Sequence, residues 1–119
     1  MRALDGEQVL VRIFIGESDR HHHKVLHHAL LERLRKEGFA GATVTHGIAG
    51  FGARSIVHTA HILDLSTDLP VIIEVVEDQA HADKLVEILD EMLDGGGLVT
   101  MEKVRVIRYS PGKPRPQTP

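Results

Sequence analysis

The stretch GFAGATVTHGIAGFG, residues 38–52, decides how this chain folds. Its small and β-branched residues alternate, with Ala40, Ala42, Val44 and Ile48 on one parity and Thr43 and Thr45 on the other. Side chains two residues apart share a face of a strand, so the alternation predicts a strand. Glycines inside a strand mark a bend or a close backbone approach, and Gly50 and Gly52 therefore predict a sharp change of direction.

The connection that follows, ARSIVHTAHILDLSTDLP, is long for a link between two strands, and connections of that length are usually functional. Guanidinium and hydroxyl groups near its start are suited to hold an anionic group. The alternative is an ordinary solvated loop. The binding hypothesis assigns the following residues to a ligand site: Gly50, Gly52, Arg54, Ser55, His58 and Thr59.

Strands and helices on either side of this stretch follow from the same kind of pattern. Alternating aliphatic residues predict strands at 8–15, at 68–77 beginning near Pro70, and at the end of the chain up to 109. A leucine stripe predicts a helix from Ser18 or Asp19 to about residue 37. Asp78 is expected to cap a second helix, whose stripe is Leu85, Ile88, Leu89 and Met92.

The order β-α-β-β-α-β predicts an α+β, ferredoxin-like fold, in which two helices cover one face of a four-stranded antiparallel sheet. Residues 1–109 form the single domain, and the proline-rich segment 110–119 is expected to be a flexible tail. The uncovered sheet face is predicted to be mostly apolar and therefore buried against copies of the chain, with a two-layer monomer as the alternative. Its predicted members are Leu10, Arg12, Phe14, Ile72, Glu74, Val76, Arg105, Ile107 and Tyr109.

Composition excludes several classes of protein. A chain of 119 residues fits one hydrophobic core, and a net charge of −3 implies no general attraction to nucleic acid. There is no cysteine, so neither disulfides nor thiolate chemistry are expected. The N-terminus lacks a signal-peptide pattern and no apolar run is long enough for a membrane span, which predicts a cytoplasmic protein.

Two further clusters carry alternative interpretations. Gly95, Gly96 and Gly97 either present backbone N–H groups to an anion such as a phosphate, or simply stop a helix. Histidines gather at the predicted start of the first helix, and His23 and His27 among them have the i, i+4 spacing of a metal-chelating pair. Side-chain packing is the favoured interpretation of these histidines, and no metal site is assigned. The histidines in question are His21, His22, His23, His27 and His28.

Catalysis has little support in the sequence. There is no nucleophile elbow and no close pair of catalytic carboxylates. Glu74 is better explained as an ion-pair partner of Arg12 or Arg105 on the sheet face. The chain is therefore not expected to be an enzyme.

Several segments resemble a known family. GFAGATVTHGIAGFGARSIVHT, LSTDLPVIIEVVE, GLVTMEKVRVIRY and the opening IFIGESD are similar to PII-like proteins classified as a domain of unknown function, whose genes often lie beside fluoride-channel or other transporter genes. The resemblance covers about residues 8–109. It implies a ferredoxin-like fold and a homotrimer whose sheets line the trimer centre.

The resemblance also implies a function. PII proteins bind small effectors, commonly adenine nucleotides, in clefts between subunits, and contact target proteins through a long loop after the second strand. The equivalent loop here is about residues 50–66, and the turn at 94–99 forms the other side of the cleft. A PII-like regulator of a target such as a transporter is therefore expected, with a metal-binding trimer that uses the histidine-rich helix start as the alternative.

Overall fold

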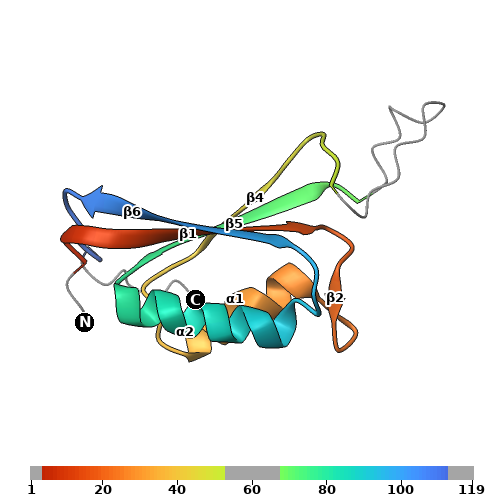
Figure 1. The fold of residues 1–119 in the computed structure, drawn as a ribbon, viewed down its shortest axis with the longest axis horizontal. Helices are drawn as coiled ribbons and strands as arrows, with labels where there is room; N and C mark the ends of the chain where they lie inside the picture. The colour runs from red at the N-terminus through yellow and green to blue at the C-terminus, as the bar shows by residue number, and fades with distance from the viewer. Residues whose placement is uncertain (1–3, 53–67, 113–119) are drawn as a thin grey trace, which may run out of the picture.

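The computed structural model describes residues 4–52 and 68–112 (Figure 1). The sheet is antiparallel throughout, in the order β4-β5-β1-β6, and a two-stranded hairpin, β2-β3, stands apart from it. This confirms the predicted ferredoxin-like arrangement. The elements are β1 (Gly6–Gly16), β2 (Arg20–His21), β3 (Lys24–Val25), α1 (Leu26–Lys36), β4 (Thr43–His46), β5 (Pro70–Glu77), α2 (Gln79–Met92) and β6 (Leu98–Val106).

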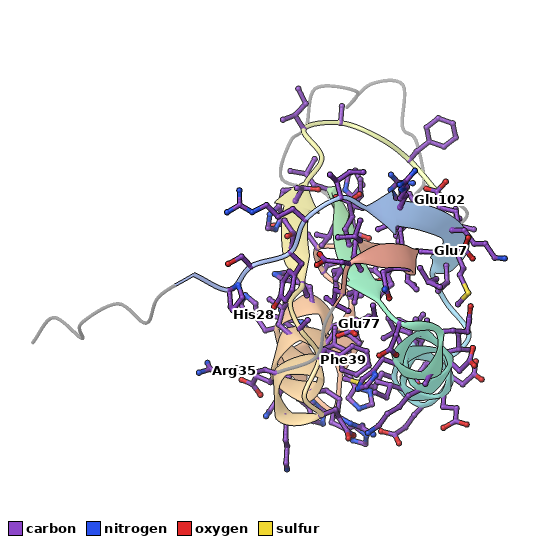
Figure 2. All side chains as sticks on the ribbon, turned by 90° about the vertical axis from the view of Figure 1, so that its left-hand side faces the viewer. Glu7, His28, Arg35, Phe39, Glu77 and Glu102 are labelled. Atoms are coloured by element: carbon purple, nitrogen blue, oxygen red, sulfur yellow. The ribbon has the colours of Figure 1, made fainter. Side chains whose placement is uncertain are left out.

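Both helices lie on the same face of the sheet (Figure 1), as the apolar alternation requires. On β1 and β5 every second side chain points toward the helices and is buried, and the predicted stripe of α2 is buried beneath them. Figure 2, an end view, shows Glu77 between the two helices and the sheet. The largest fully buried aliphatic side chains are Ile13, Leu30, Leu34, Ile73 and Leu85.

The start of the first helix was predicted wrongly. α1 begins at Leu26, not at Ser18 or Asp19, because His22 and His23 adopt left-handed backbone angles (φ 48° and 68°) that turn the chain back as the β2-β3 hairpin. The side chain of Asp19 accepts a hydrogen bond from the Gly16 N–H (2.9 Å) instead of capping a helix. Asp78, by contrast, caps α2 as predicted, by accepting from the His81 N–H (2.8 Å).

The glycine-rich stretch contains less strand than its pattern predicts. Only Thr43–His46 forms a strand paired with β5, and beyond it Gly47 adds one backbone hydrogen bond to the Pro70 carbonyl (2.7 Å). Before β4, the Ala40 N–H donates to the buried carboxylate of Glu77 (2.5 Å), which satisfies a backbone group that the sheet does not. Sheet pairing is therefore confined to four residues in the middle of the stretch.

The facing of the last strand was also predicted wrongly. Glu7 lies opposite Arg105 and Leu10 lies opposite Glu102, and directly opposed side chains share a face of the sheet. Arg105, which was predicted to lie on the open face, therefore has the parity of the helix-covered face. Val104 and Val106 have the parity of the open face instead. Ile107 and Tyr109 follow the end of β6, and Ile107 is 81% exposed.

Replacing Ile73 with alanine is expected to lower the free energy of unfolding by about 2–5 kcal/mol, because its fully buried side chain leaves a cavity between sheet and helices. Ile107→Ala is the matched control, since Ile107 lies on the surface, and its change is expected within about 0.5 kcal/mol. Urea denaturation at one fixed protein concentration measures both. Equal losses in the two variants would contradict the core described above.

Candidate functional site

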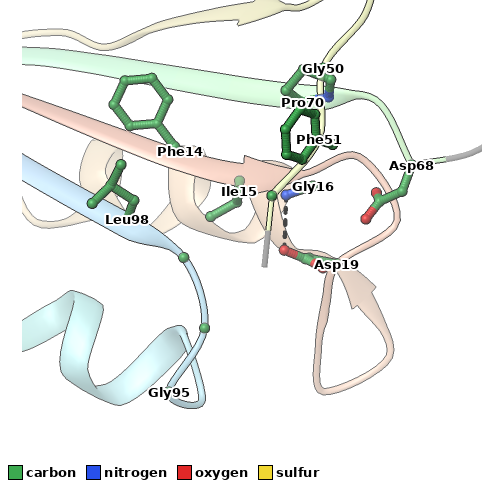
Figure 3. A pocket seen from close by; sticks show the side chains of 13 residues that line it. Phe14, Ile15, Gly16, Asp19, Gly50, Phe51, Asp68, Pro70, Gly95 and Leu98 are labelled. Atoms are coloured by element: carbon green, nitrogen blue, oxygen red, sulfur yellow. Dashed lines mark hydrogen bonds between the residues drawn. The ribbon is translucent and has the colours of Figure 1, made fainter. Parts of the chain in front are cut away.

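A cavity of about 460 Å³ opens at one end of the sheet, where the end of β1 meets the start of β6 (Figure 3). Two glycine segments that are far apart in the sequence form opposite parts of its wall: residues 50–52 after β4 and residues 95–97 after α2. The site thus depends on tertiary structure. Its lining consists of Phe14, Ile15, Gly16, Asp19, Gly50, Phe51, Gly52, Asp68, Pro70, Gly95, Gly96, Gly97 and Leu98.

The side chains around the cavity are mainly apolar. Phe14 and Leu98 are paired across β1 and β6, and Phe51 is 80% exposed at the edge of the cavity. Exposed aromatic and aliphatic side chains beside a cavity are suited to stack against a flat, apolar group such as a nucleobase. This part of the lining therefore fits the ring of a small molecule rather than its charged end.

Two carboxylates supply the polar side chains of the described lining, which contains no lysine or arginine. Asp19 accepts from the Gly16 N–H, a bond drawn in Figure 3, and Asp68 accepts from the Ser18 N–H (2.8 Å). Asp19 closes the turn after β1, and Asp68 holds that turn against the start of β5. They also leave the described wall with acceptors, which suit the hydroxyl or amino groups of a ligand.

The 95–97 turn has the helix-stopping role that the sequence suggested, while its role toward an anion stays a prediction. It stops α2, since the Gly96 N–H donates to the Leu93 carbonyl (2.9 Å). It also needs glycine beside the cavity: Gly97 has φ +91°, and an added Cβ would lie 3.3 Å from both the Phe14 carbonyl oxygen and Ile15 Cγ2. The close approach of backbone to backbone at Gly97 fixes where β6 begins.

Of the predicted ligand-binding residues, the structure brings five glycines to this one cavity: Gly50, Gly52, Gly95, Gly96 and Gly97. Arg54, Ser55, His58 and Thr59 lie outside the described residues. Asp19 and Asp68 were not among the predicted site residues, because the sequence pattern predicts a helix cap at Asp19 and a strand that includes Asp68. No local pattern signals them, because their role depends on the strand ends that meet here.

The i, i+4 geometry on which the alternative, metal-binding interpretation of the histidines depended is not present in the structure. His21, His22 and His23 belong to the β2-β3 hairpin, so His23 and His27 are not one helical turn apart. His27 lies in α1, 7% exposed, which agrees with the packing interpretation. Among the described residues, one group offers three metal-ligand atoms within 4.8 Å of one another: Glu77, Asp78 and His81. Asp78 and His81 also form the N-terminal cap of α2, so helix capping already accounts for their closeness.

Comparison with known proteins places the chain in a family. The model of DUF190, described as "Uncharacterized ACR", matches residues 8–106. The chain belongs to the DUF190 family. Among curated DUF190 relatives, a UPF0166 protein of Aquifex aeolicus is 34% identical over 99 residues, 82% of this chain and 91% of its own length. A UPF0166 protein of Methanocaldococcus jannaschii is 30% identical over 99 residues, 83% of this chain and 91% of its own length.

Solved structures similar to this DUF190 chain are PII-like, as the sequence resemblance implied. The CPII protein of Thiomonas intermedia, bound to ADP, AMP and acetate, has a TM-score of 0.63 at 14% identity, with 87% of this chain and 91% of that chain covered. A putative PII-like signalling protein of Thermus thermophilus has a TM-score of 0.59 at 22% identity, with coverages of 86% and 91%. At these identities the likeness establishes the fold. No helix in the described parts of the chain is both long and apolar enough to cross a membrane.

Replacing Gly47 with alanine is expected to disturb the cavity wall. An added Cβ would lie 2.5 Å from Cγ of Pro70, a ring that cannot swing aside, so the 47–52 segment must shift at a cost of about 1–3 kcal/mol. Gly41→Ala is the control, because no atom lies within 4 Å of its added Cβ. Thermal unfolding and the amide NMR shifts of residues 50–52 measure the effect. A Gly47→Ala spectrum unchanged at those amides would contradict the described contact with Pro70.

Proposed function

We propose that this protein is a PII-like regulatory protein that binds a small anionic effector, an adenine nucleotide in the first instance, in the cavity between the two glycine segments. The single observation that carries the proposal is the convergence of residues 50–52 and 95–97 on one cavity in a PII-like fold. The solved CPII structures, one with ADP, AMP and acetate and one with ADP and bicarbonate, supply the ligand class.

The chemistry of the cavity supports a nucleotide in one orientation. The apolar side chains Phe14, Phe51 and Leu98 suit the base, and the carboxylates of Asp19 and Asp68 suit ribose hydroxyls or the exocyclic amine. Because the described wall lacks a cationic side chain, the phosphates would extend away from these carboxylates, toward the backbone of residues 95–97. Residues outside the described ranges, with Arg54 the foremost, would neutralise them.

The functional unit we propose is a homotrimer that joins through the open sheet face. Ile72, Val76 and Val104 are only partly exposed there, although no element of the described chain covers them. Arg12 lies in the same face and binds Glu74 (2.9 Å) and Glu102 (2.7 Å), which raises its pKa and leaves a charge-paired surface. An apolar face whose one described guanidinium is already paired can associate without burying an unpaired charge.

Association would also complete the site. The cavity is open at the edge of the sheet, and in a trimer a neighbouring subunit would close it, so that effector binding and assembly support each other. The 50–66 loop would contact a target, such as a membrane transporter, and an effector that favours one loop conformation would shift its population. In this proposal the protein is a cytoplasmic binding protein and not an enzyme.

Titration calorimetry with ATP, ADP and AMP tests the effector. Binding is expected, and Phe51→Ser is expected to weaken it roughly tenfold, since stacking on an aromatic ring contributes about 1–3 kcal/mol per base. Ile48→Ser is the matched control: Ile48 is 87% exposed in the same segment but does not line the cavity. Absence of heat with all three nucleotides, or equal weakening in both variants, would overturn the proposed site.

Light scattering tests the assembly, with an expected mass of three times 13.2 kDa. Ile72→Glu is expected to shift the mass toward one subunit, because a buried carboxylate without a partner costs several kcal/mol at each interface. Val86→Glu, on the exposed side of α2, should leave the mass unchanged. A wild-type particle of one subunit mass at micromolar concentration would refute the trimer.

A further inference from the structure

Three histidine rings meet where the start of α1 packs against the end of β4. His27 of α1 is 7% exposed, and its ring lies edge-to-face against His28 (centroids 4.4 Å apart) and against His46 of β4 (5.4 Å). His28 and His46 are exposed. Within the described structure, Nδ1 of His27 is buried and has no hydrogen-bond partner. Packing, and not a hydrogen bond to that nitrogen, therefore holds the ring in place.

A proton on His27 is unfavourable for reasons that the geometry makes plain. Both ring nitrogens of a charged histidine are donors, so Nδ1 would carry a buried N–H without an acceptor. His27 is also the second residue of α1, whose first turn contains no acidic side chain and whose N-terminal end disfavours a cation.

The groups that act on His27 come from three elements. Burial is the largest cause that lowers the pKa of His27, followed by His28 on its own helix and His46 on β4, while Glu17 in the turn after β1 opposes them. The neutral ring thus packs against β4, whereas a charged ring would be repelled by His46 and drawn toward water.

The end of β4 is connected tightly to the cavity wall. His46 is the last residue of β4, and the next residue, Gly47, donates its N–H to the Pro70 carbonyl (2.7 Å). The Pro70 ring leaves no room for a Cβ at Gly47. Pro70 and residues 50–52 both line the cavity. Three residues separate His46 from Gly50, so a displacement of β4 cannot be absorbed before the chain reaches the wall.

We infer that His27, His28 and His46 form a proton-sensitive contact that controls the shape of the cavity. With His27 neutral, β4 stays packed on α1 and the wall at 50–52 is in place. With His27 protonated, the end of β4 separates from α1, the wall shifts, and the effector is released. The release depends on the proposed function, whereas the separation of β4 from α1 does not.

The direction of the pH dependence follows from linkage. Since the pKa of His27 is lowered in the folded state from its ordinary value of 6.5, the opened form binds more protons between the two values. The contact is therefore complete above about pH 6.5, and it is lost as the pH falls below that value and through the folded-state pKa. Each unit between the two pKa values corresponds to about a tenfold change in the ratio of closed to opened molecules.

Amide hydrogen exchange of Thr43–His46 in the full chain tests the contact, at about pH 7.5 and about pH 5, corrected for intrinsic exchange. Wild-type β4 is expected to lose protection at the lower pH by about tenfold for each unit of pKa difference. His27→Phe keeps an aromatic ring without a proton site and should retain protection. His22→Asn, which removes an exposed histidine at a backbone angle that asparagine tolerates, should behave as wild type. Equal loss in His27→Phe and wild type would overturn the inference.

A second measurement does not depend on the folding of any variant. NMR titration of the wild-type imidazole signals gives the pKa of His27, which is expected to lie below its ordinary value of 6.5. A measured His27 pKa at or above 6.5 would refute the contact as a proton switch.

Calorimetry with ADP at the same two pH values separates this inference from the proposed function. The affinity for ADP at the higher pH, divided by that at the lower pH, is expected to be larger in wild type and His22→Asn than in His27→Phe. Titration of the phosphate affects all three proteins equally and therefore cancels in this comparison. Equal ratios in all three proteins would overturn the switch alone. No ADP binding at either pH would overturn the proposed function, while the exchange experiment would still decide the contact.

Discussion

The pairing of β1 with both of its neighbours is the constraint on which the rest of this structure depends. β1 lies between β5 and β6, and its odd-numbered residues from Val9 to Ile15 face the two helices. A slip of one residue would bring Arg12 into the core and Ile13 to the open face, so the register is strongly specified. Both helices pack on the surface that this register creates.

The same register explains the candidate site. At the end of β1, Phe14 pairs with Leu98, the first residue of β6, and Gly16 pairs with Pro70, the first residue of β5. Three strand ends therefore meet at one place. The turn at 95–97 directly precedes β6, and the segment at 50–52, which comes after β4, lines the same cavity. A cavity forms there because glycine lets the chain approach closely at Gly97 without a side chain filling the space.

The two faces of the sheet have different consequences. On the covered face, aliphatic packing leaves one ring, that of His27, buried without a hydrogen bond to Nδ1 in the described structure. On the open face, Arg12 is paired with two glutamates and surrounded by partly exposed aliphatic residues. The first arrangement is the basis of the proposed proton sensitivity of β4 packing, and the second is the basis of the proposed association of subunits without an unpaired charge.

The ferredoxin-like order, the covered face of β1 and β5, the stripe of α2 and its Asp78 cap were determined by the sequence alone, since periodicity and capping are local properties. An ion pair of Glu74 with either Arg12 or Arg105 was foreseen for the same reason, and the structure shows Arg12 as the partner. The glycine positions at 50, 52 and 95–97 were likewise recognised as special from the residues, and the family resemblance, not the pattern, implied that they belong to one cleft.

Only the tertiary structure decided the rest. Residues 21–23 are all histidine, so the segment contains no residue that breaks a helix. The hairpin exists because His22 and His23 adopt left-handed backbone angles, which residues other than glycine rarely adopt. The facing of β6 was fixed by its register against β1, which the weak alternation of residues 98–106 could not indicate. Asp19, Asp68 and the contact of His27 with His46 depend on segments that are distant in the sequence, and a periodic pattern holds no information about which strand ends meet.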